Sequence, residues 1–177
     1  LDPTLLLNQK EWLKYACPMV FNEPYLLVYS VESKERDMIV GHIAQKVAKA
    51  KKLKIYEVNY FGENKMIPGC DKHFFYATPD LFLALIANAS YVVVSSFHGT
   101  VFSINFNKDF LSITPDRFNS RVNDLLDLAG LEYRKVSTVD DVTEKLINNS
   151  IDYVLVNNRL EMKREESKSF LKHIIKE

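Results

Sequence analysis

A histidine in a short polar turn is the side chain of this sequence best suited to acid–base chemistry. His98 lies within residues 95–100, which read Ser-Ser-Phe-His-Gly-Thr. Imidazole is the side chain that exchanges a proton near neutral pH without a perturbed pKa. The hydroxyls of Ser95, Ser96 and Thr100 could hydrogen-bond a ligand, or they could cap a helix and shape the turn. These residue types predict a ligand site, with a packing turn as the simpler alternative.

The elements on either side of the turn are predicted to be a buried strand and a short helix. Residues 92–94 are all valine, which favours a strand covered on both faces, and residues 100–106 are dense in apolar side chains. Open α/β sheets bind ligands where a strand turns into a helix, because the first helical N–H groups lack partners and carry the positive end of the dipole. We therefore expect the N–H groups of Gly99 and Thr100 to bind an anion.

Strands and helices are predicted to alternate along the whole chain. Hydrophobic patterns and turn residues indicate strands at residues 25–31, 54–58, 73–76, 92–95 and 110–113. Helices are expected at residues 34–52, 78–88, 100–106, 120–129, 139–149 and from 152 to the end. A capping box at Asn8 and Glu11 predicts a short first helix. This alternation predicts an α/β fold, a Rossmann-like parallel sheet with helices on both faces.

The usual strand order of such a sheet brings distant residues together at its carboxyl edge. In that order the first and fourth strands are neighbours, which would place residues 30–33 beside residues 95–98. Arg117 and Arg121 follow the strand at 110–113 and reach the same edge. An arginine near a helix start opposes the helix dipole, so an anionic partner would account for it, although surface arginines are often solvated. Both arginines are candidates to bind a carboxylate or a phosphate.

Composition narrows the class of protein. A length of 177 residues suits one globular domain, and 23 basic residues balanced by 23 acidic ones leave no net field to attract nucleic acid. No apolar run is long enough to span a membrane, and the first residues lack the basic region and cleavage site of a signal peptide. With only 2 cysteines there is no disulfide framework. These features favour a cytoplasmic protein.

Several motifs are incomplete or absent. Cys70 and His73 are metal-ligand types at close spacing, but no second pair follows, so no metal site is expected. The sequence has neither a G-x-G-x-x-G fingerprint nor a P-loop, which argues against dinucleotide or nucleoside triphosphate cofactors, and it lacks the G-x-S-x-G elbow of serine hydrolases. The charged residues 163–166 are interpreted as a solvated helix face.

Residues 96–100, Ser-Phe-His-Gly-Thr after a strand, resemble the motif of the polysaccharide pyruvyl transferase family. The likeness extends to three neighbouring stretches, residues 78–86, 102–108 and 121–134. Residues 1–7 with Trp12 resemble the joint between the two halves of a family member, so the chain is similar to the carboxyl-terminal half. Some branches carry an arginine where this chain has Ser96, so that contribution to anion binding would come from elsewhere.

The resemblance implies a fold, a division of the chain and a reaction. The chain would be the second domain of a glycosyltransferase-B-like architecture, with residues 1–20 as an interdomain segment with a short helix, 21–150 as the Rossmann-like donor-binding domain and 151–177 as a C-terminal amphipathic helix. Family members transfer the pyruvyl group of phosphoenolpyruvate to two hydroxyls of a sugar as a ketal and release phosphate. By resemblance, His98 takes the acid–base or phosphate-binding role, and Arg121 falls on a motif position.

The resemblance also implies partners. They are phosphoenolpyruvate as donor substrate, a saccharide acceptor and an N-terminal domain that completes the cleft, without a cofactor or a metal ion. The chain by itself is then expected to be inactive. Two other functions stay open, because fold does not settle function. One is a glycosyltransferase domain that uses a nucleotide-sugar, and the other is a non-catalytic carbohydrate-binding module.

Overall fold

One parallel sheet organises the molecule. A computed structural model describes residues 1–59, 67–113 and 119–175 of the chain. Its 6-stranded sheet has the order β3-β2-β1-β4-β5-β6, with every pair of neighbours parallel. The strands are β1 (Tyr25–Ser30), β2 (Lys54–Asn59), β3 (Lys72–Phe74), β4 (Tyr91–Val94), β5 (Phe110–Ile113) and β6 (Lys135–Val136). The Rossmann-like α/β fold expected from the sequence is confirmed.

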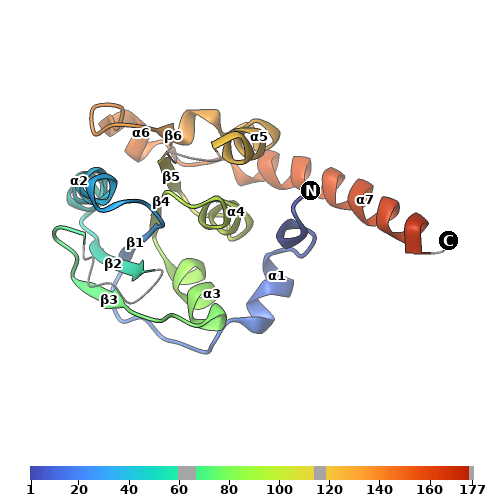
Figure 1. Cartoon of the computed structure of the whole chain (residues 1–177), viewed down its shortest axis with the longest axis horizontal. Helices are drawn as coiled ribbons and strands as arrows, with labels where there is room; N and C mark the ends of the chain where they lie inside the picture. Colours follow the sequence, from blue (N-terminus) through green and yellow to red (C-terminus); the bar gives the residue numbers. More distant parts are fainter. Residues whose placement is uncertain (60–66, 114–118, 176–177) are drawn as a thin grey trace.

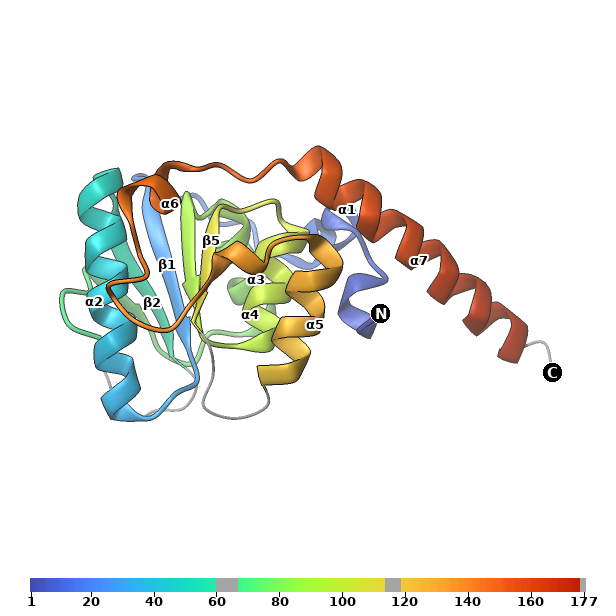
Figure 2. The same ribbon diagram turned by 90° about the horizontal axis from the view of Figure 1, so that it is seen from above.

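Helices cover both faces of the sheet, as Figures 1 and 2 show. They are α1 (Gln9–Trp12), α2 (Lys34–Lys51), α3 (Pro79–Asn88), α4 (Phe97–Asn105), α5 (Asn119–Ala129), α6 (Glu144–Asn148) and α7 (Tyr153–Ile175), with 3₁₀ turns at Pro3–Leu5, Leu13–Tyr15 and Glu132–Arg134. Helices α2 and α6 pack on one face, and α3, α4 and α5 on the other.

Alternate residues of the central strands fill separate cores. In β4, Val92 and Val94 pack with the α3 and α4 side, whereas Val93 packs with the α2 side. All three valines have no exposed surface. Burial on both faces explains why the strand reads as a continuous apolar run rather than an alternating one.

Three helix boundaries differ from those expected. Helix α4 begins at Phe97 rather than after Gly99, because the Ser96 side chain caps it. Helix α5 begins at Asn119, so Ser120 lies inside the helix instead of capping it. Helix α6 covers only Glu144–Asn148, where Thr143 provides the cap. The caps of α4 and α6 are side-chain hydrogen bonds, which hydrophobic periodicity does not contain.

The N-terminal segment packs along α4. The predicted capping box is confirmed, since Asn8 N donates to Glu11 Oε2 at 2.8 Å and Glu11 N donates to Asn8 Oδ1 at 3.1 Å. Trp12 Nε1 donates to Thr4 O at 2.8 Å, and its ring meets Phe102 edge-on at a centroid distance of 5.1 Å. These contacts fold residues 1–15 back onto the helix that begins at the His98 turn.

Arg164 attaches α7 to this arrangement and is not part of a solvated face. The side chain is 5% exposed, which corrects the interpretation of residues 163–166. Its Nε donates to Leu5 O at 2.7 Å and its Nη2 donates to Asn105 Oδ1 at 2.9 Å. The partners come from segments 159 and 59 residues away in sequence, which is why the local charge pattern did not reveal the burial.

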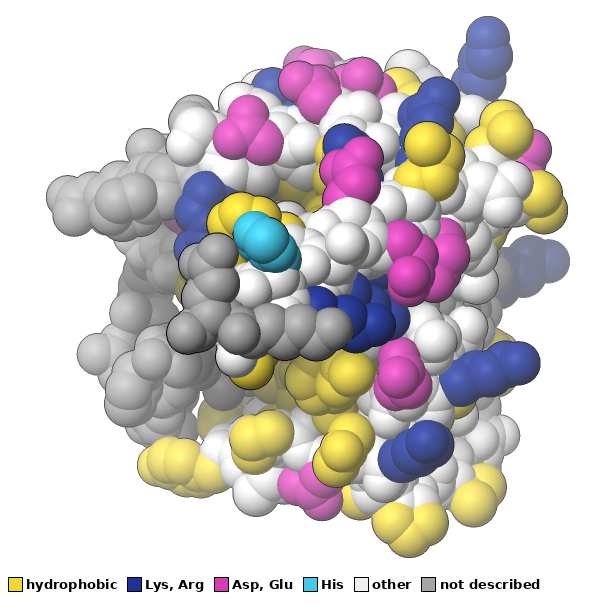
Figure 3. All heavy atoms as spheres, turned by 90° about the vertical axis from the view of Figure 1, so that its right-hand side faces the viewer, with side chains coloured by type: hydrophobic (Ala, Val, Ile, Leu, Met, Phe, Trp, Pro, Cys, Tyr) yellow, Lys and Arg dark blue, Asp and Glu magenta, His cyan; other side chains and the backbone are white. Residues whose placement is uncertain are grey.

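The segment after α1 exposes large apolar side chains. Figure 3 shows hydrophobic side chains gathered in the lower part of the face, at the level of α1 and the chain that follows it. The exposed hydrophobic residues of this segment are Leu13, Tyr15, Met19 and Val20, the last with 85% of its surface exposed. Among the described helices, none combines the length and the apolar character needed to cross a membrane.

Replacing Arg164 tests its role as the anchor of α7. In Arg164→Met, Leu5 O and Asn105 Oδ1 lose their donors in a buried environment, so we expect the free energy of unfolding to fall by about 2–4 kcal/mol. The measurement is urea denaturation followed by circular dichroism. Lys163→Met is the control, since its pair with Glu166 is exposed and its loss should cost less than about 0.5 kcal/mol. Equal losses in the two variants would contradict the anchoring role.

Candidate functional site

The carboxyl ends of β1 and β4 meet through their serines. Tyr29 of β1 pairs with Val94 of β4, and just beyond them Ser30 Oγ lies 3.0 Å from Ser95 Oγ. Ser30 Oγ donates to Asp37 Oδ1 at 2.6 Å, so the Ser95 hydroxyl is the donor between the serines. Ser95 Oγ also accepts from Val31 N at 3.2 Å. Residues 30–31 thus lie beside Ser95, as the expected strand order predicted.

The N–H groups of Gly99 and Thr100, which the sequence predicts to bind an anion, form hydrogen bonds within the first turn of α4 instead. Gly99 N donates to Ser96 Oγ at 3.4 Å, and Thr100 N donates to Ser96 O at 3.0 Å. These two N–H groups therefore already have acceptors within the protein. By helix geometry, Phe97 and His98 are the residues of the turn whose N–H groups have no intrahelical acceptor. The amides available to an anion lie one and two residues before Gly99.

The glycine lets α4 start against the sheet. A Cβ at Gly99 would lie 2.9 Å from Val94 Cγ1 and 3.0 Å from Tyr29 Cδ1. Any larger residue would push the helix start away from β1 and β4, and His98 with it. The close approach of the backbone to two strands thus explains why the motif has a glycine at position 99.

The hydroxyls of the turn face the protein interior. Ser95, Ser96 and Thr100 are all buried. Thr100 Oγ1 donates to Ser96 O at 3.0 Å and lies 3.1 Å from Ser112 Oγ on β5. These side chains hold the turn between neighbouring strands, which positions the exposed end of α4.

His98, Arg121 and an aromatic ring share the outer surface of the turn. His98 is exposed, and its ring meets the Phe97 ring edge-on at 5.3 Å. The guanidinium carbon of Arg121 lies 3.9 Å from the centre of the same Phe97 ring. A guanidinium over an aromatic face is held in place while its N–H donors stay available. Arg117, the other arginine candidate, lies outside the described residues.

Asp2 joins this group from the far end of the sequence. Its Oδ2 accepts from Arg121 Nη2 at 3.0 Å. Burial by itself would raise the pKa of Asp2, but hydrogen bonds from Thr4 and the positive charges of His98 and Arg121 hold it below its ordinary value. Sequence reasoning missed Asp2, because its contact with Arg121 spans 119 residues. Its single local signal is the cap that it forms on the turn at Pro3–Leu5.

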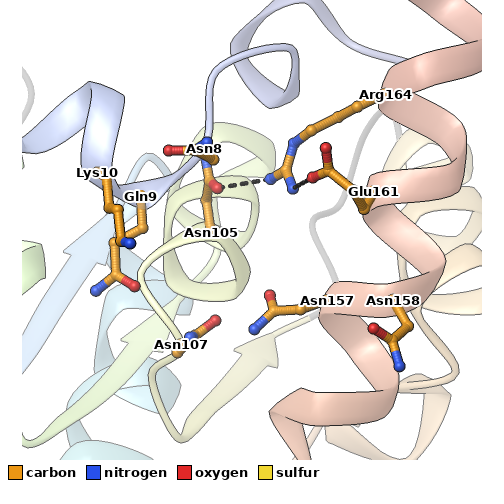
Figure 4. Close-up of a pocket in the computed structure, with 9 residues that line it drawn as sticks. All are labelled: Asn8, Gln9, Lys10, Asn105, Asn107, Asn157, Asn158, Glu161 and Arg164. Atoms are coloured by element: carbon orange, nitrogen blue, oxygen red, sulfur yellow. Dashed lines mark hydrogen bonds and ion pairs between the residues drawn. The ribbon is translucent and has the colours of Figure 1, made fainter.

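Two cavities border α4, one at each end. At the His98 end a cavity of about 290 Å³ is lined by Leu1, Asp2, Leu5, Phe97, Arg121, Asp124, Leu125 and Leu128. A cavity of about 380 Å³ lies at the other end, lined by Asn8, Gln9, Lys10, Asn105, Asn107, Asn157, Asn158, Glu161 and Arg164 (Figure 4). The smaller cavity contains Arg121 and Phe97 and lies between the N-terminal segment, the start of α4 and helix α5.

The chain matches one family. The model of the family described as "Polysaccharide pyruvyl transferase" matches residues 1–117, which is 117 of the 177 residues. The matched part contains the first five strands and the His98 turn, whereas Arg121 and helices α5 to α7 follow it. Among curated proteins, none matches this chain.

The Ser95 hydroxyl is expected to stabilise the joint between β1 and β4. Ser95→Ala removes the acceptor of Val31 N and the partner of Ser30 Oγ, which should lower the free energy of unfolding by about 1–3 kcal/mol. Ser90 is the matched control, because it is exposed at the opposite end of the same strand, and Ser90→Ala should change stability by less than about 0.5 kcal/mol. Both are measured by urea denaturation. An unchanged free energy of unfolding in Ser95→Ala would show that the joint does not depend on this hydroxyl.

Proposed function

The chain belongs to the polysaccharide pyruvyl transferase family, and from this premise we propose that it is the donor-binding domain of a transferase that moves the pyruvyl group of phosphoenolpyruvate to a saccharide. The observation that supports the proposal is the grouping of His98 and Arg121 on the Phe97 ring at the start of α4. An exposed imidazole, a guanidinium and unpaired helix amides at one sheet edge are the groups that an anionic substrate with a leaving phosphate requires.

Arg121 has the geometry to exchange one anion for another. Its pair with Asp2 is exposed, with 55% of the arginine side chain accessible, so the interaction is weak in water. A phosphate or carboxylate of the donor can accept two parallel hydrogen bonds from the guanidinium, and the nearby amides of Phe97 and His98 add to its binding. Asp2 then orients Arg121 in the absence of donor and yields to the donor when it binds.

Proton transfer is the role proposed for His98. Ketal formation adds a proton to the methylene carbon of the enolpyruvyl group, removes the protons of two sugar hydroxyls and releases inorganic phosphate. An exposed imidazole at the mouth of the donor site can pass a proton to the methylene carbon or to the leaving phosphate, and can recover one from an attacking hydroxyl. The buried Ser95, Ser96 and Thr100 together with Gly99 keep the imidazole in position.

The acceptor is proposed to bind from a second domain. The exposed apolar side chains at Leu13, Tyr15, Met19 and Val20 lie on the segment that resembles an interdomain joint, and such side chains favour burial against another surface. We infer a glycosyltransferase-B-like pair of domains with the reaction in the cleft between them, in the cytoplasm where phosphoenolpyruvate is made. On this proposal the chain alone binds donor and releases no phosphate in the presence of an acceptor.

Donor binding by the isolated chain tests the proposal. Calorimetric titration should show phosphoenolpyruvate binding, and Arg121→Gln should weaken it by roughly 10- to 100-fold, because a hydrogen-bonded charge is lost. Arg159→Gln, an exposed arginine on α7, is the control and should bind like the wild type. Binding of UDP or GDP in place of phosphoenolpyruvate would instead favour a nucleotide-sugar glycosyltransferase.

Activity of an enzyme that carries this domain together with its acceptor domain tests His98. His98→Ala should lower kcat by roughly 10²- to 10⁴-fold if the imidazole moves a proton in the rate-limiting step. His98→Gln keeps a hydrogen-bonding side chain but cannot titrate, so a similar loss in kcat assigns proton transfer, and a raised KM with normal kcat assigns phosphate binding. His42→Gln, on the exposed side of α2, is the control. Wild-type kinetics in both His98 variants would exclude the histidine from the site.

The amide-lined cavity favours a second candidate function, carbohydrate binding. Figure 4 shows Asn107 and Asn157 facing each other across it, and amides both donate to and accept from sugar hydroxyls. Saccharide titration followed by NMR distinguishes the two functions. If binding to the chain is lost in Asn157→Ala and kept in His98→Ala, the chain carries a carbohydrate-binding site apart from the donor site. No saccharide binding would leave the donor-binding function alone.

A further inference from the structure

A glutamate, a cysteine and a histidine converge at the β2–β3 edge of the sheet. Glu57 on β2 is the register partner of His73 on β3, and Cys70 lies just before β3. His73 Nδ1 is 2.8 Å from Glu57 Oε2. One ligand atom from each of the three side chains lies within 4.8 Å of the other two. The sequence shows Cys70 and His73 at close spacing, and the strand register adds the third side chain.

The imidazole of this cluster lacks ordinary partners. The His73 side chain is only 12% exposed, and neither of its ring nitrogens has a hydrogen bond of acceptable geometry among the described residues. Buried polar atoms in native structures nearly always have a partner, because an unpaired one costs free energy. The short approach to Glu57 therefore does not by itself satisfy the ring.

The surroundings of the cluster enclose its ligand atoms. The Glu57 side chain is only 2% exposed, and its Oε2 also accepts from Ile67 N at 3.1 Å. Cys70 is half-buried. Three side chains of zinc-binding type therefore lie together in a largely enclosed place, where a metal ion would give the unsatisfied imidazole a partner.

We propose that Glu57, Cys70 and His73 bind a zinc ion, with water in the remaining tetrahedral position. Sulfur, nitrogen and carboxylate oxygen together are zinc ligands, whereas magnesium and calcium require mostly oxygen. As the sulfur–zinc bond forms, the thiol proton leaves to solvent. The thiolate and the carboxylate then neutralise the divalent ion, so the buried site carries no net charge.

The side chains need only a small rearrangement to reach zinc geometry. Bonds of about 2.0–2.3 Å in a tetrahedron set ligand atoms roughly 3.3–3.8 Å apart. The single S–H of Cys70 has two possible acceptors, Ile55 O at 3.3 Å and Lys72 O at 3.1 Å, and either contact is lost at little cost because the thiol is a weak donor. The metal would join the residues before β3 to β2.

A zinc ion there would stabilise the weakest edge of the sheet. Strand β3 has only 3 residues, and the residues preceding it pack against α2 through Pro68, whose carbonyl accepts from Gln45 Nε2 at 2.6 Å. So short an edge strand has few backbone hydrogen bonds of its own. None of the three ligands lines the cavity beside Phe97 and Arg121, so the proposal does not rest on donor binding.

Cobalt substitution tests the site directly in the wild-type chain. After treatment with a chelator, Co²⁺ should give the visible bands of a tetrahedral ion together with an ultraviolet thiolate-to-cobalt charge-transfer band, and Zn²⁺ should displace it at about one ion per chain. Zn²⁺ should also raise the thermal midpoint of unfolding, and Mg²⁺ should not. Octahedral Co²⁺ spectra, a missing thiolate band or no binding would each overturn the proposal.

Matched variants assign the ligands. Cys70→Ser and Glu57→Gln should each weaken Co²⁺ and Zn²⁺ affinity by more than about 100-fold. Loss of a residue that only hydrogen-bonds to a metal ligand already lowers metal affinity by up to about 100-fold, and loss of the ligand itself should lower it further. Cys17→Ser and His42→Gln, which alter the other cysteine and an exposed histidine, should bind like the wild type. Circular dichroism verifies that the variants fold. Equal affinity in Cys70→Ser and Cys17→Ser would show that the metal binds elsewhere.

Discussion

The pairing of β1 with β4 is the contact on which the rest of the structure depends. The chain builds the sheet outward from β1 through β2 to β3, and then returns to the other side of β1 with β4. At this reversal the connections leave the strand ends in opposite directions, and the buried hydroxyls of Ser30 and Ser95 hydrogen-bond across the joint. Gly99 then allows α4 to start directly against both strands. The exposed His98 owes its place to this packing.

Helix α4 links the candidate site to the N-terminal and C-terminal segments of the chain. Its first turn carries His98 and the Phe97 ring that supports Arg121, and its last turn carries Asn105, which accepts from Arg164 of α7. Arg164 also binds the carbonyl of Leu5, close to the segment that supplies Asp2 to Arg121. The C-terminal helix and the N-terminal segment are therefore both parts of the domain that positions the candidate site, although neither belongs to its sheet.

The His98 turn and the Glu57 cluster differ in where they lie on the sheet and in how exposed they are. The His98 turn lies beyond the carboxyl ends of the central strands, where backbone amides and exposed cations can meet a ligand. The Glu57 cluster lies within the β2–β3 ladder on the α2 face, where side chains are mostly enclosed. The enclosed cluster offers three ligand atoms to a cation, whereas the exposed groups at the turn favour exchange of anions.

The sequence by itself determined the fold class and the strands β1 to β5, because hydrophobic periodicity, Pro79 at a helix start and the Asn8–Glu11 capping box are local signals. It did not indicate β6, which has only 2 residues. It also contained the motif around His98. Only the tertiary structure decided which distant residues meet: Asp2 with Arg121, Arg164 with Leu5, and Glu57 with Cys70 and His73. Strand register and the burial of charged groups depend on residues far apart in the chain, and a local pattern carries no record of such contacts.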